Sequence, residues 1–202
     1  MSFLFDFSII NLACFSSKFL TPCFFITLFI EQLVIRKKSI TILIKNFMTV
    51  EYLNVYNNLI NLTTNKKLYI SLRSQDTFSD RLTIFLLHFA FFLKAFKTKD
   101  NKKVLQNIYD FNFRQIELSI REIGYGDQSI NKKMKDYINL FHSVINEIHF
   151  WDDLDLNNKK KKISLFLSNY DKIDHLVEYF DDFHNILLKK TLNSFLKSVS
   201  NP

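Results

Sequence analysis

Two apolar stripes at helical spacing, separated by a pair of glycines, most constrain how this chain can fold. Before the glycines, apolar residues recur every three or four positions, at Leu105, Tyr109, Phe113, Ile116, Ile120 and Ile123. After the glycines the same spacing resumes, at Ile130, Met134, Ile138, Phe141, Ile145 and Ile148. Residues at this spacing share one face of an α-helix, so the sequence predicts two long amphipathic helices joined by a short turn.

The turn contains both glycines of the 202-residue chain, Gly124 and Gly126. Gly124 follows the first stripe at the C′ position, where a left-handed backbone ends a helix and glycine has no Cβ to hinder it. We expect Gly126 to make a second sharp bend, and Asp127 or Ser129 to accept a hydrogen bond from the first amides of the next helix. The segment therefore predicts an αα-hairpin with a turn at 124–126. A phosphate-binding loop is poorly supported, because no strand precedes this G-x-G.

The other segments between residue 48 and the C-terminus also have a helical pattern. A first helix is marked by Tyr52, Val55, Leu59 and Leu62, and candidate N-caps for the next helix are Asp76, Thr77, Ser79 and Asp80. Residues 81–96 are apolar nearly all round but include His88 and Lys94, which predicts a buried core helix rather than a membrane span. Residues 159–168 and 170–198 supply further helix. The predicted fold class is all-α, a bundle of about six helices in one domain over residues 48–202.

Residues 1–47 differ from this domain. The apolar stretch Phe19–Ile35 is interrupted by Glu31 and followed by three basic residues. One interpretation is a membrane anchor with its basic end in the cytoplasm. The other is that Met48 is the true start of the protein. The only two cysteines, Cys14 and Cys23, lie here, and they indicate a reducing compartment rather than a disulfide framework.

The net charge of +7 would ordinarily favour a phosphate-bearing partner or an anionic lipid surface. However, a chain with 23 Phe, 2 Gly and 2 Pro has the composition expected of an AT-rich genome, which also supplies Lys to solvated helix faces. Two lysine clusters are candidates for contacts with ribosomal RNA or anionic lipid, namely Lys159–Lys162 and the group Lys132, Lys133 and Lys135. The same clusters are also consistent with plain solvated faces.

Candidate catalytic and metal-binding residues are sparse. Asp181 and His184 form a D-x-x-H pair on one helical face, but a di-metal bundle needs a second copy that the chain lacks. His142 and His149 have no carboxylate at helical spacing, and the apolar surroundings of His88 favour a satisfied core histidine. Since no nucleophile–base pattern or cofactor loop is found, we expect no enzyme activity, no bound metal and no cofactor.

The segment IELSIREIGYGDQSINKKMKDY resembles the signature of the ubiquinol–cytochrome c reductase (complex III) assembly chaperones, the cytochrome b chaperones of mitochondria and alphaproteobacteria. The matching positions are Arg121, Glu122, Gly124, Gly126, Asp127, Lys132, Lys133 and Lys135. A second block, DTFSDRLTIFLLHFAFFL, is similar to another motif of the family and contributes Asp76, Thr77, Arg81 and His88. The chain departs from the family at Asp80, where a glycine is usual, and at LFHSV, which replaces F-x-G-R.

This resemblance implies a non-enzymatic assembly factor. It implies cytochrome b as client, a small partner chaperone, association with the ribosome near its exit tunnel, and peripheral contact with the inner membrane, but no DNA. The expected location is the cytoplasmic side of a bacterial inner membrane, or alternatively the matrix side of the mitochondrial one. The expected partner-binding residues are Arg121, Glu122, Gly124, Gly126, Asp127, Lys132, Lys133, Lys135, Asp76 and Arg81. The alternative function is a basic helical module that binds ribosomal RNA or an anionic membrane surface without a dedicated cytochrome b client.

Overall fold

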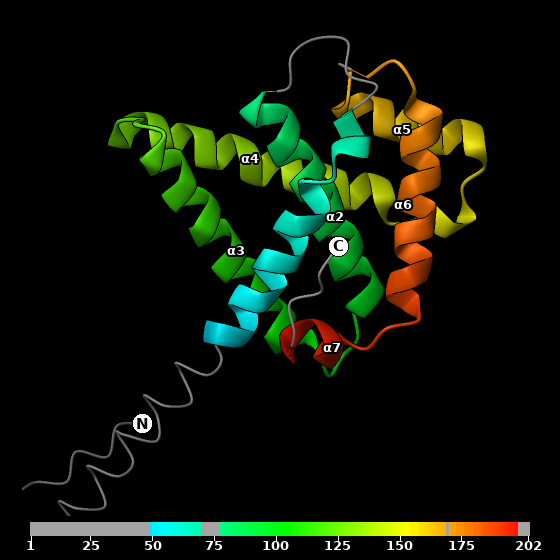
Figure 1. Cartoon of the computed structure of the whole chain (residues 1–202), viewed down its shortest axis with the longest axis horizontal. Helices are drawn as coiled ribbons and strands as arrows, with labels where there is room; N and C mark the ends of the chain where they lie inside the picture. Colours follow the sequence, from blue (N-terminus) through cyan, green and yellow to red (C-terminus); the bar gives the residue numbers. More distant parts are fainter. Residues whose placement is uncertain (1–48, 70–76, 169, 198–202) are drawn as a thin grey trace, which may run out of the picture. The chain divides into compact units, whose positions relative to one another are not determined.

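The described part of the chain is entirely helical. The computed structural model describes residues 49–69, 77–168 and 170–197, and none of these residues forms a strand. Asp76 and the apolar stretch before Met48 therefore lie outside the described residues. The all-α fold class is confirmed, and a bundle of about six helices fits the arrangement in Figure 1.

The elements follow one another with short connections. The first helix spans residues 49–63 and is followed by a 3-10 turn, η1 (Lys66–Tyr69). The longer helices are α2 (Phe78–Phe96), α3 (Lys102–Glu122), α4 (Asp127–Ile148) and α6 (Ile173–Leu188). The shorter elements are η2 (Trp151–Asp153), α5 (Leu156–Phe166) and α7 (Leu192–Lys197).

Helix α2 lies at the centre of the bundle and contacts both α4 and α6. Most of its residues are buried, which confirms the core helix expected from its apolar sequence. The ring of Phe89 stacks on Phe141 of α4 at 5.1 Å, and Phe91 stacks on Phe180 of α6 at 5.3 Å. The phenylalanine-rich segment therefore fills the core, where each aromatic side chain removes a large apolar area from water.

Helix α2 starts at Phe78, three residues before the predicted start, because Thr77 caps it. The Thr77 hydroxyl accepts a hydrogen bond from the Asp80 amide, and the Asp80 carboxylate accepts one from the Thr77 amide. This reciprocal arrangement is a capping box and satisfies amides that would otherwise lack partners. Of the four candidate N-caps, Thr77 is thus the one used, and Asp80 has the complementary role.

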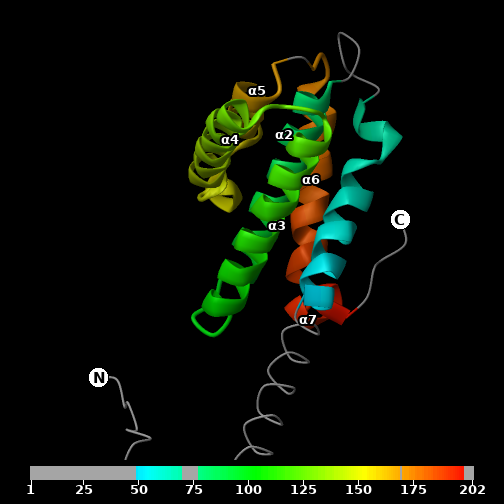
Figure 2. The ribbon, with the colours of Figure 1, turned by 90° about the vertical axis from the view of Figure 1, so that its left-hand side faces the viewer.

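Helices α3 and α4 form the predicted hairpin (Figures 1 and 2). Leu105, Phe113, Ile116 and Ile120 of the first stripe are buried, as are Ile130, Phe141 and Ile148 of the second. Ile123 was expected to continue the first stripe, but it is 52% exposed. Ile123 is the C-cap of α3 and still has helical dihedrals, but it lies in the exposed stretch 121–129 beyond the part of α3 that packs on the core.

The predicted helix over 170–198 is instead two helices. It breaks after Leu188, and α7 turns back so that Phe195 and Leu196 are buried. The Asn54 amide of the first helix donates to the Leu196 carbonyl at 2.9 Å, and the Phe195 ring packs edge-on against Phe92 at 5.5 Å. Continuing straight would have carried these two apolar side chains away from the core. Burial of the C-terminal segment therefore decides the break.

Candidate functional site: the hairpin vertex

The turn between α3 and α4 has one strained residue rather than two. Helix α3 ends with Ile123 as its C-cap, and Gly124 follows with a φ of +97°. The Gly124 amide donates to the Arg121 carbonyl at 2.9 Å. A side chain is strongly disfavoured at such a φ, so the prediction of Gly124 as the left-handed C′ residue is confirmed.

Gly126 has a different role from the one expected. Its φ of −71° and ψ of 155° are extended, and a Cβ placed on it would meet nothing within 4 Å. Gly126 is itself the N-cap of α4, and Asp127 is the first helical residue. The expected second sharp bend at Gly126 and the expected N-cap at Asp127 or Ser129 are therefore wrong. Any residue can adopt the extended conformation of this N-cap. The second glycine of the G-x-G pattern is therefore not evidence for a second sharp bend.

Arg121 connects the two helices across the turn. Its Nη1 lies 2.6 Å from Asp127 Oδ1, and its Nε and Nη2 donate to Glu117 Oε1 at 3.1 and 2.8 Å. The hydrogen bonds from Glu117 and then from Asp127 raise the pKa of Arg121 above its usual value. The Asp127 carboxylate also lies at the N-terminus of α4, where the helix dipole favours negative charge. The charged residues beside the glycines thus clamp the end of α3 to the start of α4.

The rest of the vertex faces solvent. Residues 121–129, which we call the hairpin vertex, are all exposed, including the apolar side chains of Ile123 and Tyr125. Lys133 lies over the Tyr125 ring at 4.4 Å, a cation–π contact that holds this aromatic side chain against the start of α4. Glu122 is exposed as well. The vertex therefore offers two apolar side chains among charges, a surface suited to contact with another protein.

The remaining expected site residues lie near the vertex or outside the described residues. Lys132 and Lys135 are exposed on the first turns of α4. Arg81, in the first turn of α2, lies over the Tyr69 ring at 5.8 Å. Arg81 also lines a groove of about 490 Å³ whose wall includes Ile116 and Ser119 of α3. The second motif block therefore lies against α3, the helix that carries the start of the first block.

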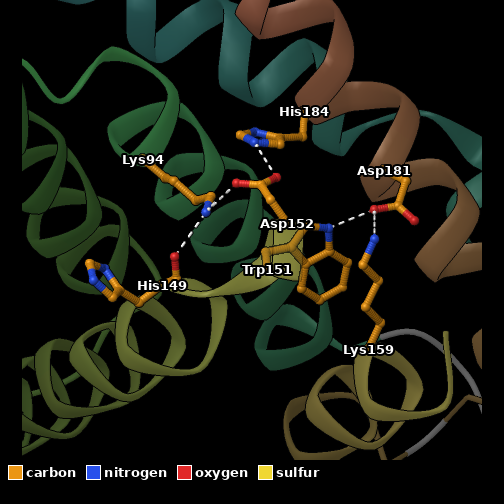
Figure 3. Close-up of polar contacts among 7 residues, drawn as sticks. All are labelled: Lys94, His149, Trp151, Asp152, Lys159, Asp181 and His184. Atoms are coloured by element: carbon orange, nitrogen blue, oxygen red, sulfur yellow. Dashed lines mark hydrogen bonds and ion pairs between the residues drawn. The ribbon is translucent and has the colours of Figure 1, made fainter. Parts of the chain in front are cut away.

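A second cluster of polar residues was not expected from the sequence (Figure 3). Lys94 of α2 pairs with Asp152 of η2 at 2.8 Å and donates to the His149 carbonyl at 2.9 Å. The other carboxylate oxygen of Asp152 lies 3.0 Å from His184 Nε2 on α6. Partial burial alone would raise the pKa of Asp152, but Lys94 and His184 outweigh it and lower that pKa. Burial lowers the pKa of His184, although Asp152 opposes that shift.

The same cluster continues on the other side of η2. The buried Trp151 donates from Nε1 to Asp181 Oδ1 at 2.6 Å, and Lys159 of α5 pairs with the same oxygen at 2.8 Å (Figure 3). We call Lys94, Trp151, Asp152, Lys159, Asp181 and His184 the polar network. Because these residues come from α2, η2, α5 and α6, the network fastens four elements together. In the D-x-x-H pair of α6, Asp181 thus contacts Lys159 and the Trp151 indole, and His184 contacts Asp152.

The comparisons with known proteins concern the vertex. Residues 71–149 match the sequence model of the family described as Ubiquinol-cytochrome C chaperone. The resemblance to the ubiquinol-cytochrome c chaperone family is thus confirmed over residues 71–149. The matched segment contains the capping box of α2, the whole α3–α4 hairpin and its vertex. It ends before Trp151, so five of the six residues of the polar network lie beyond it.

A solved structure has the same fold as this chain. The crystal structure of the Cbp3 homolog from Brucella abortus superposes with a TM-score of 0.61 over 83% of this chain and 92% of the other. The two sequences are 21% identical, so the similarity concerns the fold. Among the curated proteins, no sequence matches the chain.

The lysine cluster of α5 is largely engaged within this domain. Lys159 pairs with Asp181, Lys160 with Asp174 at 2.6 Å, and Lys162 with Glu147. Three of the four lysines therefore already neutralise carboxylates of α4 and α6. A phosphate would have to compete with these ion pairs, so Lys159–Lys162 is a poor candidate for RNA or lipid.

The described residues show little that would support chemistry. In residues 49–69, 77–168 and 170–197, no three His, Cys, Asp or Glu side chains are grouped closely enough to hold a metal. His88 is the satisfied core histidine that was expected. Its Nδ1–H donates to the Ile84 carbonyl and its Nε2 accepts from the Tyr179 hydroxyl, both at 2.8 Å. Burial lowers the pKa of His88 to about 4, so the ring is neutral at pH 7.

Within the part of the chain that the structure describes, no helix combines the length and the apolar character that crossing a bilayer requires.

Proposed function

We propose that this chain is a non-enzymatic assembly factor that binds newly made cytochrome b and promotes assembly of ubiquinol–cytochrome c reductase, respiratory complex III. The observation that carries the proposal is the match of residues 71–149 to the ubiquinol-cytochrome c chaperone family. The match includes the exposed vertex, whose side chains hold the turn together and leave an outward face of mixed apolar and charged character.

The vertex is the proposed docking surface of the chaperone. Arg121 and Asp127 are engaged with each other, so their contribution is to fix the shape of the turn. Glu122, Ile123 and Tyr125 are exposed and are the side chains that a partner would contact first. A rigid turn that presents apolar and charged groups loses little conformational entropy on binding, which favours recognition of a partner.

The proposed cellular location follows from the proposed client, cytochrome b. Because cytochrome b is a membrane protein, the chaperone would act peripherally at the inner membrane, on the cytoplasmic side in a bacterium or the matrix side in a mitochondrion. A small partner chaperone and the ribosome near its exit tunnel are the further proposed partners at the vertex. The ion pairs of Lys159, Lys160 and Lys162 weigh against the alternative of a module that binds RNA through that cluster.

Site-specific photocrosslinking in living cells tests this proposal. A photoreactive phenylalanine analogue at Tyr125 should crosslink cytochrome b and, in translating cells, ribosomal proteins. The same analogue at Phe150 is a matched control, because Phe150 is also an exposed aromatic residue and lies beyond the matched segment. The proposal is wrong if deletion of the gene leaves complex III at its normal level, or if both positions capture the same proteins.

A further inference from the structure

A second groove lies at the open end of the α3–α4 hairpin, far from the vertex. It has a volume of about 750 Å³ and lies between the end of α2, the first turns of α3 and the last turn of α4. Its apolar lining includes Leu93, Leu105, Tyr109, Ile145 and Ile148. The groove reaches Tyr109 on α3, so at 1.5 Å per residue about 18 Å of helix separates its near edge from Arg121 at the vertex.

The rim of this groove is positively charged on one side. Lys97, Lys99 and Lys102 all line it, and all three are exposed. No carboxylate of the described residues, 49–69, 77–168 and 170–197, pairs with any of the three. This differs from α5, where three of four lysines are paired. The uncompensated charge at the groove indicates an anionic occupant.

The start of α3 strengthens the positive potential at this rim. The N-cap, Asn101, makes no side-chain cap hydrogen bond, and the first turn of α3 contains no acidic residue. The helix dipole therefore adds to the charge of the lysines, and the exposed Asp100, directly before the N-cap, offsets part of this potential. Lys94, the fourth lysine of the lining, is already held by Asp152 and the His149 carbonyl and belongs to the wall.

The chemistry of the floor favours an acyl chain over a peptide. A peptide brings backbone amides and carbonyls that need partners when they are buried. The polar groups near the floor are engaged, because Gln106 Nε2 donates to Asp110 at 2.9 Å and the His149 carbonyl accepts from Lys94. An acyl chain has no such groups, and a single anionic headgroup matches a rim that is charged on one side. The volume lies within the range of small-ligand sites.

We propose that this groove binds an anionic phospholipid of the membrane, with the headgroup phosphate on Lys97, Lys99 and Lys102 and acyl chain against the floor between α2, α3 and α4. The site needs neither cytochrome b nor the vertex. It would hold the open end of the hairpin at the bilayer while the vertex, at the other end of α3 and α4, stays available to a protein partner.

Flotation of the purified full chain with vesicles tests the proposal. At physiological salt we expect binding to vesicles of phosphatidylcholine with phosphatidylglycerol, and little binding to phosphatidylcholine alone. The triple variant K97Q/K99Q/K102Q should lose at least about tenfold in binding, since each lysine near an anionic surface contributes appreciably. The control triple K161Q/K172Q/K189Q removes the same charge from exposed positions elsewhere and should change binding by less than about twofold.

Two further experiments test whether the ligand is a lipid or a free phosphate compound, and whether the apolar floor of the groove takes part in binding. Binding of short-chain phosphatidylglycerol without binding of glycerol 3-phosphate supports a lipid, whereas equal binding of both would overturn it. I145Q, which places an amide on the half-buried floor, should weaken lipid binding while circular dichroism shows an unchanged fold. Equal losses in the two triple variants, or binding of an acidic amphipathic peptide but not of anionic vesicles, would overturn the proposal. Because no client is present, such a failure leaves the proposed chaperone function untouched.

Discussion

The hairpin vertex and the polar network use the same kinds of charged side chain in opposite surroundings. At the vertex, Arg121 pairs with residues that are four and six positions away from it in the chain, and every residue from 121 to 129 is exposed. In the network, Lys159 and Asp181 are mostly buried and connect different helices around the indole of Trp151. A cluster of charged residues is therefore a candidate docking surface only when its ion pairs join residues close in the sequence and the surrounding side chains are exposed to solvent.

The two regions also have different expected roles in the protein. The network lies almost wholly beyond the family-matched segment, and it fastens α5 and α6 to the core. The vertex lies inside that segment and contributes little to the packing of the domain. We therefore expect substitutions in the network to change stability and substitutions at the vertex to change partner binding.

The largest effect is expected from Trp151→Ala in the network. Trp151 is 1% exposed and packs edge-on against Phe91 at 5.1 Å, so its removal should lower the free energy of unfolding by about 3–5 kcal/mol. Urea unfolding followed by circular dichroism measures this, because Trp151 is the only tryptophan. The control Trp151→Phe keeps an aromatic ring and loses the hydrogen bond to Asp181, and should cost less. A loss below about 1 kcal/mol for the alanine variant would contradict the role given to the network.

Acidification is expected to destabilise the packing of α2 against α6 before it affects the hairpin vertex. The folded-state pKa of His88 is about 4, below the ordinary 6.5, so the unfolded chain binds the proton first. Stability is therefore complete above about pH 6.5 and falls as the pH drops toward 4, by on the order of 3 kcal/mol. The lowered pKa of His184 acts in the same direction.

Denaturation profiles between pH 7 and pH 4, with hydrogen exchange of α6, measure this acid effect. The variant His88→Gln removes the titrating group and should flatten the profile. If Gln is not tolerated in the core, the ring signals of His88 in the parent protein give the answer by NMR. A wild-type profile that is flat over this range, or a His88 ring that titrates near pH 6.5, would refute the prediction.

A smaller effect, and one of opposite sign at two neighbouring positions, is expected from serine at the glycines. Gly124→Ser forces a side chain onto a φ of +97° and should destabilise the domain by about 1–2 kcal/mol. Gly126→Ser places a preferred capping residue at an extended N-cap with free space around it, and should leave stability equal or slightly higher. Thermal unfolding of the two variants compares them directly. Equal destabilisation would mean that both glycines are needed for the bend.

Local rules in the sequence predicted the helices and the left-handed Gly124 and placed Thr77 among four candidate N-caps of α2, because each depends on residues a few positions apart. The polar network could not be predicted in this way. Its partners are far apart in the chain, as with Trp151 and Asp181, and helical spacing does not say which faces will meet. The break before α7 was missed for the same reason, since only the packed core shows that Phe195 and Leu196 gain burial by turning back.

The smallest effect on stability, but the clearest effect on function, is expected at the vertex. Glu122→Lys alters an exposed residue and should move the unfolding midpoint by less than about 3 °C. If the vertex docks a partner, the same variant should reduce capture of cytochrome b by the photoreactive analogue at Tyr125 and lower the cellular level of complex III. The matched control is Asp182→Lys, which makes the same charge change on an exposed position of α6.

The Arg121→Gln variant then separates clamping from docking. It breaks the bonds to Asp127 and Glu117 and leaves Glu122 in place. If Arg121 serves partners only by shaping the turn, restoring rigidity in another way should restore binding, for example with the Gly126→Ser cap in the Arg121→Gln background. If the double variant has the unfolding midpoint of the parent protein but still does not bind the partner, the Arg121 guanidinium itself contacts the partner. The vertex would then bind through its charges as well as through its shape, and would differ from the polar network in this respect.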